Sequence, residues 1–130
     1  MGRRGERGSA TVELAVAAPA VLALVGLVVL GGRVETARQV VAQAAEDAAR
    51  AATLARSNSA MSGDAQAAAA ADLAGRDCGA WNLSLSGVVS PGAVISARVT
   101  CTTGLGMLPG SFTATGTASA VVDSYRGVAR

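Results

Sequence analysis

An uncharged run of 17 residues near the N-terminus restricts the fold more than any other feature of this sequence. It covers residues 14–30 and reads LAVAAPAVLALVGLVVL. With Ala10 and Val12 before it and Gly31 and Gly32 after it, the run reaches the ~20 residues that an apolar helix needs to cross a bilayer. We therefore predict a membrane span in the first quarter of the 130-residue chain, which leaves room for one small domain.

Basic residues on the N-terminal side of the run indicate its orientation. Arg3, Arg4 and Arg7 stand against the single acid Glu6, and segments rich in arginine tend to stay in the cytoplasm. The charge bias that follows the run is weaker. The sequence thus predicts a single-pass protein of the cytoplasmic membrane, with a cytoplasmic N-terminus and an extracytoplasmic C-terminal domain.

The helical pattern continues beyond the apolar run. Small apolar residues recur at spacings of three and four, with polar residues between them. Glu46 and Arg50 form a pair in the favourable order, and alanine has the highest helix propensity. We therefore expect one continuous helix to about Arg56 with a narrow seam of small residues. The seam comprises Val34, Ala37, Val41, Ala44, Ala48, Ala51 or Ala52, and Ala55.

The rest of the chain changes to a strand pattern. Residues 57–63 form a polar break, after which Asp64 is a candidate cap for a short helix to about Ala74. From Trp81 onward, polar and apolar residues alternate in three segments, separated by Gly/Pro-rich turns at residues 90–92 and 104–110. Because three strands alone are marginally stable, one sheet face should pack on the helix. The predicted fold class is α+β: a long N-terminal helix packed against a small antiparallel sheet of about three strands.

The composition argues against catalysis and against nucleic-acid binding. The chain has no histidine, and Asp123, Tyr125 and Arg126 lack a neighbouring base or nucleophile motif. Its net charge of +2 is spread without a basic block, and only 2% of its residues are aromatic. We predict no enzyme, no catalytic residue, no metal or other cofactor, no nucleic-acid partner and no small-molecule substrate.

Two cysteines, Cys78 and Cys101, enclose a 24-residue loop on the side that the charge bias places outside the cytoplasm. Two thiols alone cannot supply four zinc ligands, and exported cysteines are usually oxidised. We predict a disulfide, worth ~3 kcal/mol by the loop-closure model, that ties the helical half to the middle strand. With the opposite orientation both thiols would be free.

Glu13 lies at the start of the apolar stretch, where a carboxylate costs on the order of 3 kcal/mol unless it is paired or reaches the headgroups. It either marks the cytoplasmic edge of the span or has a partner. Its setting, GSATVE after a short basic leader, resembles the prepilin peptidase site of type IV pilin-like proteins. The resemblance implies cleavage between Gly8 and Ser9 and an assembly contact for Glu13. The usual phenylalanine at the first mature position is Ser9 here.

A closer resemblance is to the TadE-like pseudopilins of the tight-adherence system. It covers residues 7 to about 38, including Glu13, Pro19 and Gly32-Arg33, and the C-terminal ATGTASAVVDSYRG is also similar. This resemblance implies a minor pilin that takes part in assembling tight-adherence pili or a related secretion system. The implied partners are a prepilin peptidase, pilin subunits, the pilus assembly machinery and membrane lipid.

The residue patterns and this resemblance together predict five segments. These are a leader at 1–8, a transmembrane helix at 9–32, its extracytoplasmic continuation at 33–56, a loop and short helix at 57–77, and a disulfide-tied β-domain at 78–130. Within the span, Pro19 is expected to kink the helix, although membrane helices also tolerate proline without a special role.

A different hypothesis is that the first thirty or so residues are a conventional signal peptide. The chain would then be a small secreted or membrane-anchored envelope protein with no pilus role. Against this, no A-x-A motif follows the run, and its 17 residues exceed the usual 7–15 of a signal peptide. Mature size separates the two, because pilin-type cleavage removes eight residues and signal peptidase removes about thirty. A membrane-tethered enzyme is the third possibility, which the lack of histidine disfavours.

Overall fold

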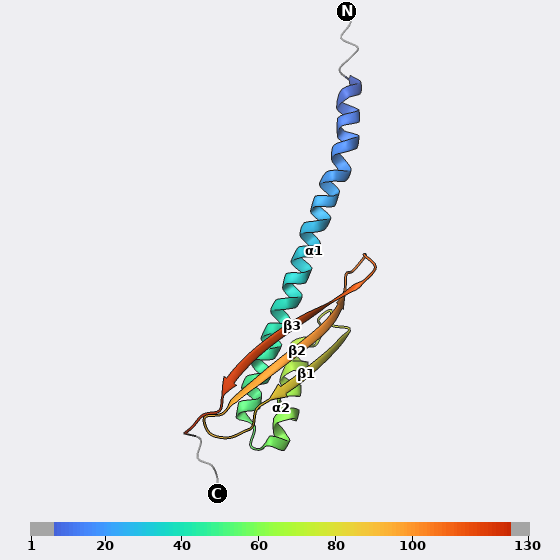
Figure 1. Ribbon diagram of the computed structural model, residues 1–130. Coiled ribbons are helices and arrows are strands. Elements are labelled where there is room, and N and C mark those ends of the chain that lie inside the picture. Colours follow the sequence, from blue (N-terminus) through green and yellow to red (C-terminus); the bar gives the residue numbers. More distant parts are fainter. Residues whose placement is uncertain (1–6, 126–130) are drawn as a thin grey trace, which may run out of the picture. The chain divides into compact units, whose positions relative to one another are not determined.

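The computed structural model describes residues 7–125, with side chains from Thr11 onward. Its five elements are two helices followed by three strands (Figure 1). They are α1 (Arg7–Leu54), α2 (Asn58–Leu73), β1 (Ala80–Ser86), β2 (Val94–Gly104) and β3 (Ser111–Val121). The predicted fold class is confirmed. The chain forms two compact units that divide after Arg33, and each is described by itself.

The first unit contains the N-terminal part of α1. From Thr11 to Val29 every side chain is exposed, including Leu14 at 70% and Leu22 at 71%. The helix is uninterrupted at Pro19, at Gly26 and at the Gly31-Gly32 pair. By its length and composition, this helix is able to cross a membrane. An apolar surface of this kind has no protein neighbour within its own unit, so a nonpolar environment must come from outside this unit.

The second unit is built around the alanine-rich part of α1. The predicted small-residue seam is confirmed and is wider than expected, because Ala45 and Ala49 are buried as well. A helix face of side chains no larger than valine allows another backbone to come close. The residues of this face that are at most 1% exposed are Val41, Ala44, Ala45, Ala48, Ala49 and Ala52.

The second helix begins earlier than predicted. The polar stretch that suggested a break is its first turn: Ser57 is the N-cap, and its Oγ accepts a hydrogen bond from the Ala60 amide at 3.2 Å. Asp64 lies inside the helix and does not cap it. Serine and asparagine favour both loops and helix starts, because their short side chains satisfy nearby backbone groups. Asn58 also accepts a hydrogen bond from the Val89 amide at 2.6 Å, which ties the start of α2 to the β1–β2 connection.

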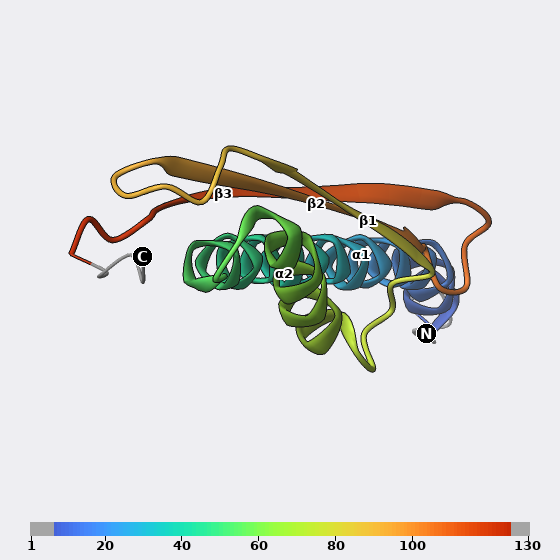
Figure 2. The ribbon, with the colours of Figure 1, turned by 90° about the horizontal axis from the view of Figure 1, so that it is seen from below.

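The three strands form one antiparallel sheet in the order β1-β2-β3. Along the central strand the side chains alternate as predicted, so that Ile95, Ala97, Val99 and Cys101 are buried while Arg98 points to the other face. Within the second unit, α2 and the later part of α1 both lie on one face of the sheet (Figure 2). The core is therefore a single layer between one sheet face and two helices, and the opposite sheet face is not covered by the described elements of this unit.

Gly116 lets β3 pack directly on α1. A Cβ atom placed on Gly116 would lie 2.6 Å from the carbonyl carbon of Val41 and 2.7 Å from the Cα of Ala42. Real Cβ atoms essentially never approach backbone atoms so closely, and backbone atoms cannot rotate away as a flexible side chain can. A position without a side chain is thus required where the sheet crosses the helix.

A disulfide joins Cys78 and Cys101, with 5.7 Å between their Cα atoms. Cys78 follows α2, and Cys101 lies on the buried side of the central strand. The bond links the end of the helical half to the middle of the sheet, as the sequence predicts.

Candidate functional site

The candidate processing and assembly residues lie at the start of α1. Gly8 and Ser9 fall in its first helical turns, and residues 1–6 of the predicted leader lie outside the described residues. Glu13 follows one turn later with an exposed side chain. Pro19 lies further along the same uninterrupted helix, so the kink expected there stays a prediction.

Glu13 carries the only charge between Arg7 and Arg33. Arg7 is six residues away, or about 9 Å along a helix axis, which is beyond the one-turn spacing at which helical side chains pair. The 17 uncharged residues after Glu13 cover about 25 Å as a helix, close to the ~30 Å thickness of a hydrocarbon layer. If this run fills the layer, Glu13 lies at one of its edges, where a partner from outside the chain can reach it.

Residues 8–50 match the family model of the TadE-like protein. Over these residues the chain is similar to the TadE-like family. The match begins at Gly8, includes Glu13 and Pro19, and extends past the predicted limit of residue 38 into the alanine-rich part of α1. It stops before α2, the strands and the disulfide. The searches against curated proteins and against solved structures returned no match.

The TadE-like family is pilin-like and generally not enzymatic. Across residues 7–125 no three His, Cys, Asp or Glu side chains gather in a group that could hold a metal ion.

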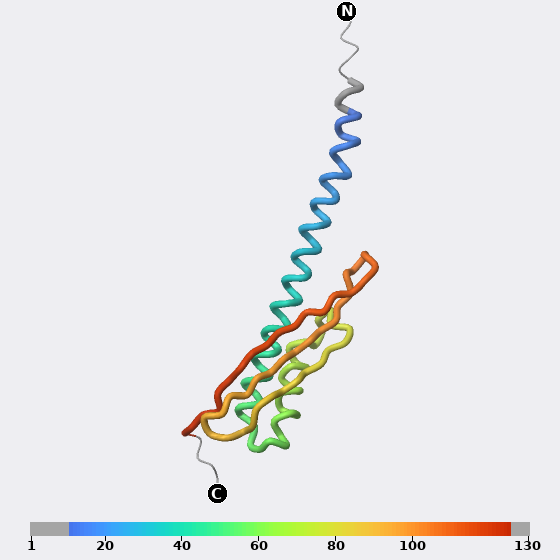
Figure 3. Tube along the Cα trace, viewed as in Figure 1, coloured from blue at the N-terminus to red at the C-terminus, as the bar shows by residue number. Residues whose placement is uncertain are grey.

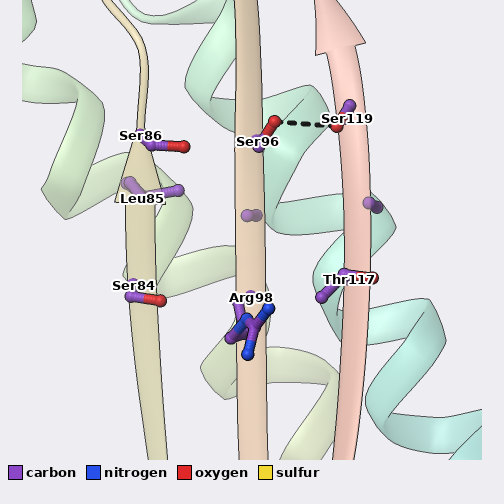
Figure 4. Close-up of a pocket in the computed structure, with 9 residues that line it drawn as sticks. Ser84, Leu85, Ser86, Ser96, Arg98, Thr117 and Ser119 are labelled. Carbon is purple, nitrogen blue, oxygen red and sulfur yellow. Dashed lines mark hydrogen bonds between the residues drawn. The ribbon is translucent and has the colours of Figure 1, made fainter.

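Beyond the TadE-like segment, the outer sheet face carries an open groove of about 640 Å³. In Figure 4 the guanidinium of Arg98 lies between Ser84 of β1 and Thr117 of β3, which are its register partners. One step along the strands, Ser96 and Ser119 share a hydrogen bond of 2.8 Å. The lining groups offer hydrogen bonds and one positive charge but no general base. Sequence reasoning did not single out this groove, although the alternation of polar residues along all three strands contained the signal.

Two carboxyl groups, Asp47 of α1 and Asp72 of α2, lie together where the helices meet. The buried Oδ2 atom of Asp72 has no hydrogen-bond partner among the described residues. Burial, a hydrogen bond with Asp47 and the negative charge of Asp47 raise the pKa of Asp72 above its ordinary value of 3.8, and the nearby Arg76 opposes this shift. The folded protein therefore holds a proton on Asp72 more tightly than the unfolded chain does.

We expect Asp72→Asn to stabilise the protein at neutral pH. An acid whose pKa is raised by folding stabilises the fold while protonated, and this contribution is lost as the pH rises from about 3.8 through the higher pKa of the folded state. Asparagine keeps the shape and donates a hydrogen bond to Asp47 at every pH. Thermal unfolding of both proteins across this range should show midpoints that diverge as the pH rises. Asp64→Asn, at an exposed position of the same helix, is the control, and equal midpoints for Asp72→Asn and wild type at pH 7 would contradict the prediction.

Proposed function

We propose that this TadE-like protein is a minor pilin or pseudopilin that a prepilin peptidase cuts between Gly8 and Ser9. It would then take part in assembling tight-adherence pili or a related secretion system. The supporting observation is the setting of Glu13, the only charge between Arg7 and Arg33, within a TadE-like segment that begins at Gly8. Similarity to the TadE-like family supports an association with the Tad pilus machinery.

The proposed role of Glu13 follows from its lack of a basic neighbour within the span. Cleavage after Gly8 frees a positively charged α-amine on Ser9 at the border of the apolar layer. A carboxylate and an ammonium that meet there neutralise one another, whereas either one alone carries a desolvation cost. Contact between Glu13 of one subunit and Ser9 of its neighbour would thus favour docking in one axial register. The long apolar helix holds each subunit in the membrane until it is taken up.

The experiment is intact-mass measurement and N-terminal sequencing of the full chain, extracted from membranes of a host that has the prepilin peptidase. We expect the wild-type chain to begin at Ser9 and the Gly8→Ala chain to keep its leader. Glu13→Gln removes the charge and leaves the junction in place, so it should be processed but should co-purify poorly with pilin subunits.

Other outcomes would reject the proposal. A chain that begins near Arg33 would show a conventional signal peptide and a secreted protein. An intact N-terminus in the wild type would leave a membrane-anchored protein without pilin-type processing. If Glu13→Gln co-purifies with pilins as well as wild type does, the charge-pairing role of Glu13 is wrong even where cleavage occurs.

A further inference from the structure

The connection between β2 and β3 has large apolar side chains at a hairpin tip. The tip reads LGMLPG over residues 105–110, so that large apolar residues stand among the glycines and proline that are usual in such turns. Met107 is 105% exposed and Leu108 is 55% exposed. No charged residue occurs between Arg98 and Asp123, so the tip and the strand residues nearest to it carry no charge.

The tip has a defined conformation. The amide of Leu105 donates a hydrogen bond to the Gly110 carbonyl at 3.2 Å, which closes the loop. Gly106 and Gly110 take φ values of 74° and 122°, in the region where glycine is favoured. Leu105 is half-buried at the base. The loop thus presents Met107 and Leu108 outward from a closed turn.

The tip lies at the end of the second unit where the chain enters it. Gly116 crosses α1 at Val41, and β3 starts five residues earlier, at Ser111. In two perpendicular views the β2–β3 tip lies toward the end of this unit at which α1 enters it, and the β1–β2 turn lies at the other end (Figures 1 and 2). The trace in Figure 3 follows the two long strands up to this tip. Val34 is the first residue of this unit and follows the apolar part of α1. This end of the unit is therefore attached to the proposed membrane span.

We propose that Met107 and Leu108 insert into the lipid interface of the membrane that anchors α1. The contact would be a second, shallow attachment beside the span. Apolar side chains bind an interface by burying ~5–10 Å deep at the boundary between headgroups and acyl chains. Uncharged neighbours suit this position, because no ionised group has to be desolvated. The inference rests on the proposed membrane anchoring by α1, and lipid is the occupant because the tip is held at the tethered end of its unit.

The test places a tryptophan at the tip of the full-length chain in lipid vesicles. Met107→Trp is made in a Trp81→Phe background, so that the new residue is the only tryptophan. The matched control is Val88→Trp in the same background, since Val88 is 54% exposed and lies in the connection at the other end of the sheet. Quenching by phospholipids brominated on the upper acyl chain reports contact with lipid, and vesicle flotation reports anchoring by α1 independently.

We expect both variants to float with the vesicles and only the tryptophan at position 107 to be quenched and shifted to the blue. Equal, water-like emission at positions 107 and 88 in floating protein would overturn the lipid contact while leaving the anchoring intact. A blue shift at position 107 without quenching by brominated lipid would also overturn it, because the tip would then contact protein. Failure to float would reject the anchoring on which the inference depends.

Discussion

Gly116→Val will unfold the second unit or strongly destabilise it. The new side chain would start from a Cβ atom 2.6 Å from the carbonyl carbon of Val41 and 2.7 Å from the Cα of Ala42, with the Val41 carbonyl oxygen nearer still. Overpacking against side chains costs ~1–3 kcal/mol, and here the obstacle is helix backbone, which moves only if β3 leaves α1. We expect a loss at or above the upper end of that range.

The measurement is denaturant or thermal unfolding of the full chain in detergent, followed by circular dichroism. Gly104→Val is a matched control, because Gly104 is also a strand glycine and a Cβ there meets nothing within 4 Å. The control should unfold close to wild type, since valine suits a strand. If the two variants unfold at the same midpoint, the close approach of β3 to α1 at Gly116 is wrong.

Removing the disulfide will have the second-largest effect. Cys78 and Cys101 are separated by 23 positions. In the loop-closure model, a disulfide across a loop of that length stabilises the fold by ~3 kcal/mol, because it lowers the entropy of the unfolded chain. We expect the double variant Cys78→Ser/Cys101→Ser to lose about this much stability. The loss is large for a unit whose buried side chains are mostly alanine, because each alanine removes little apolar area from water.

Reduced wild-type protein is the control for this prediction. It should unfold near the midpoint of the double serine variant, and oxidised wild type should unfold later. If a reducing agent leaves the wild-type midpoint unchanged while the serine variant is destabilised, the loss would come from serine packing and not from the cross-link.

The elements that could be predicted are those whose sequence pattern repeats over many residues. The small-residue spacing in α1 persists from Val34 to Ala55, about six helical turns, and the alternation around Ile95 and Val99 persists through β2. The start of α2 was predicted too late because one side chain decides it. Ser57 caps a helix there, yet the same residue type also begins loops.

Features that depend on contacts between distant parts of the chain could not be predicted. Nothing local marks Gly116 as the crossing point with Val41, or Asp72 as the partner of Asp47. Glu13 was recognisable because one charge stands out in an apolar run, and the cysteine pair because only two cysteines exist. The orientation in the membrane and cleavage after Gly8 stay predictions, since both depend on other proteins of the cell that insert or cut the chain.

The alanine face of α1 has a consequence for how this protein can diverge. Alanine has no side-chain rotamers, so ordering it costs no side-chain entropy, but it also offers no alternative packing when a neighbour grows. A core of leucines can absorb a larger residue by turning side chains, whereas the face from Val41 to Ala52 can only separate from its neighbours. Over evolutionary time, substitutions should therefore accumulate on the outer sheet face around Arg98, while the helix-facing positions remain small.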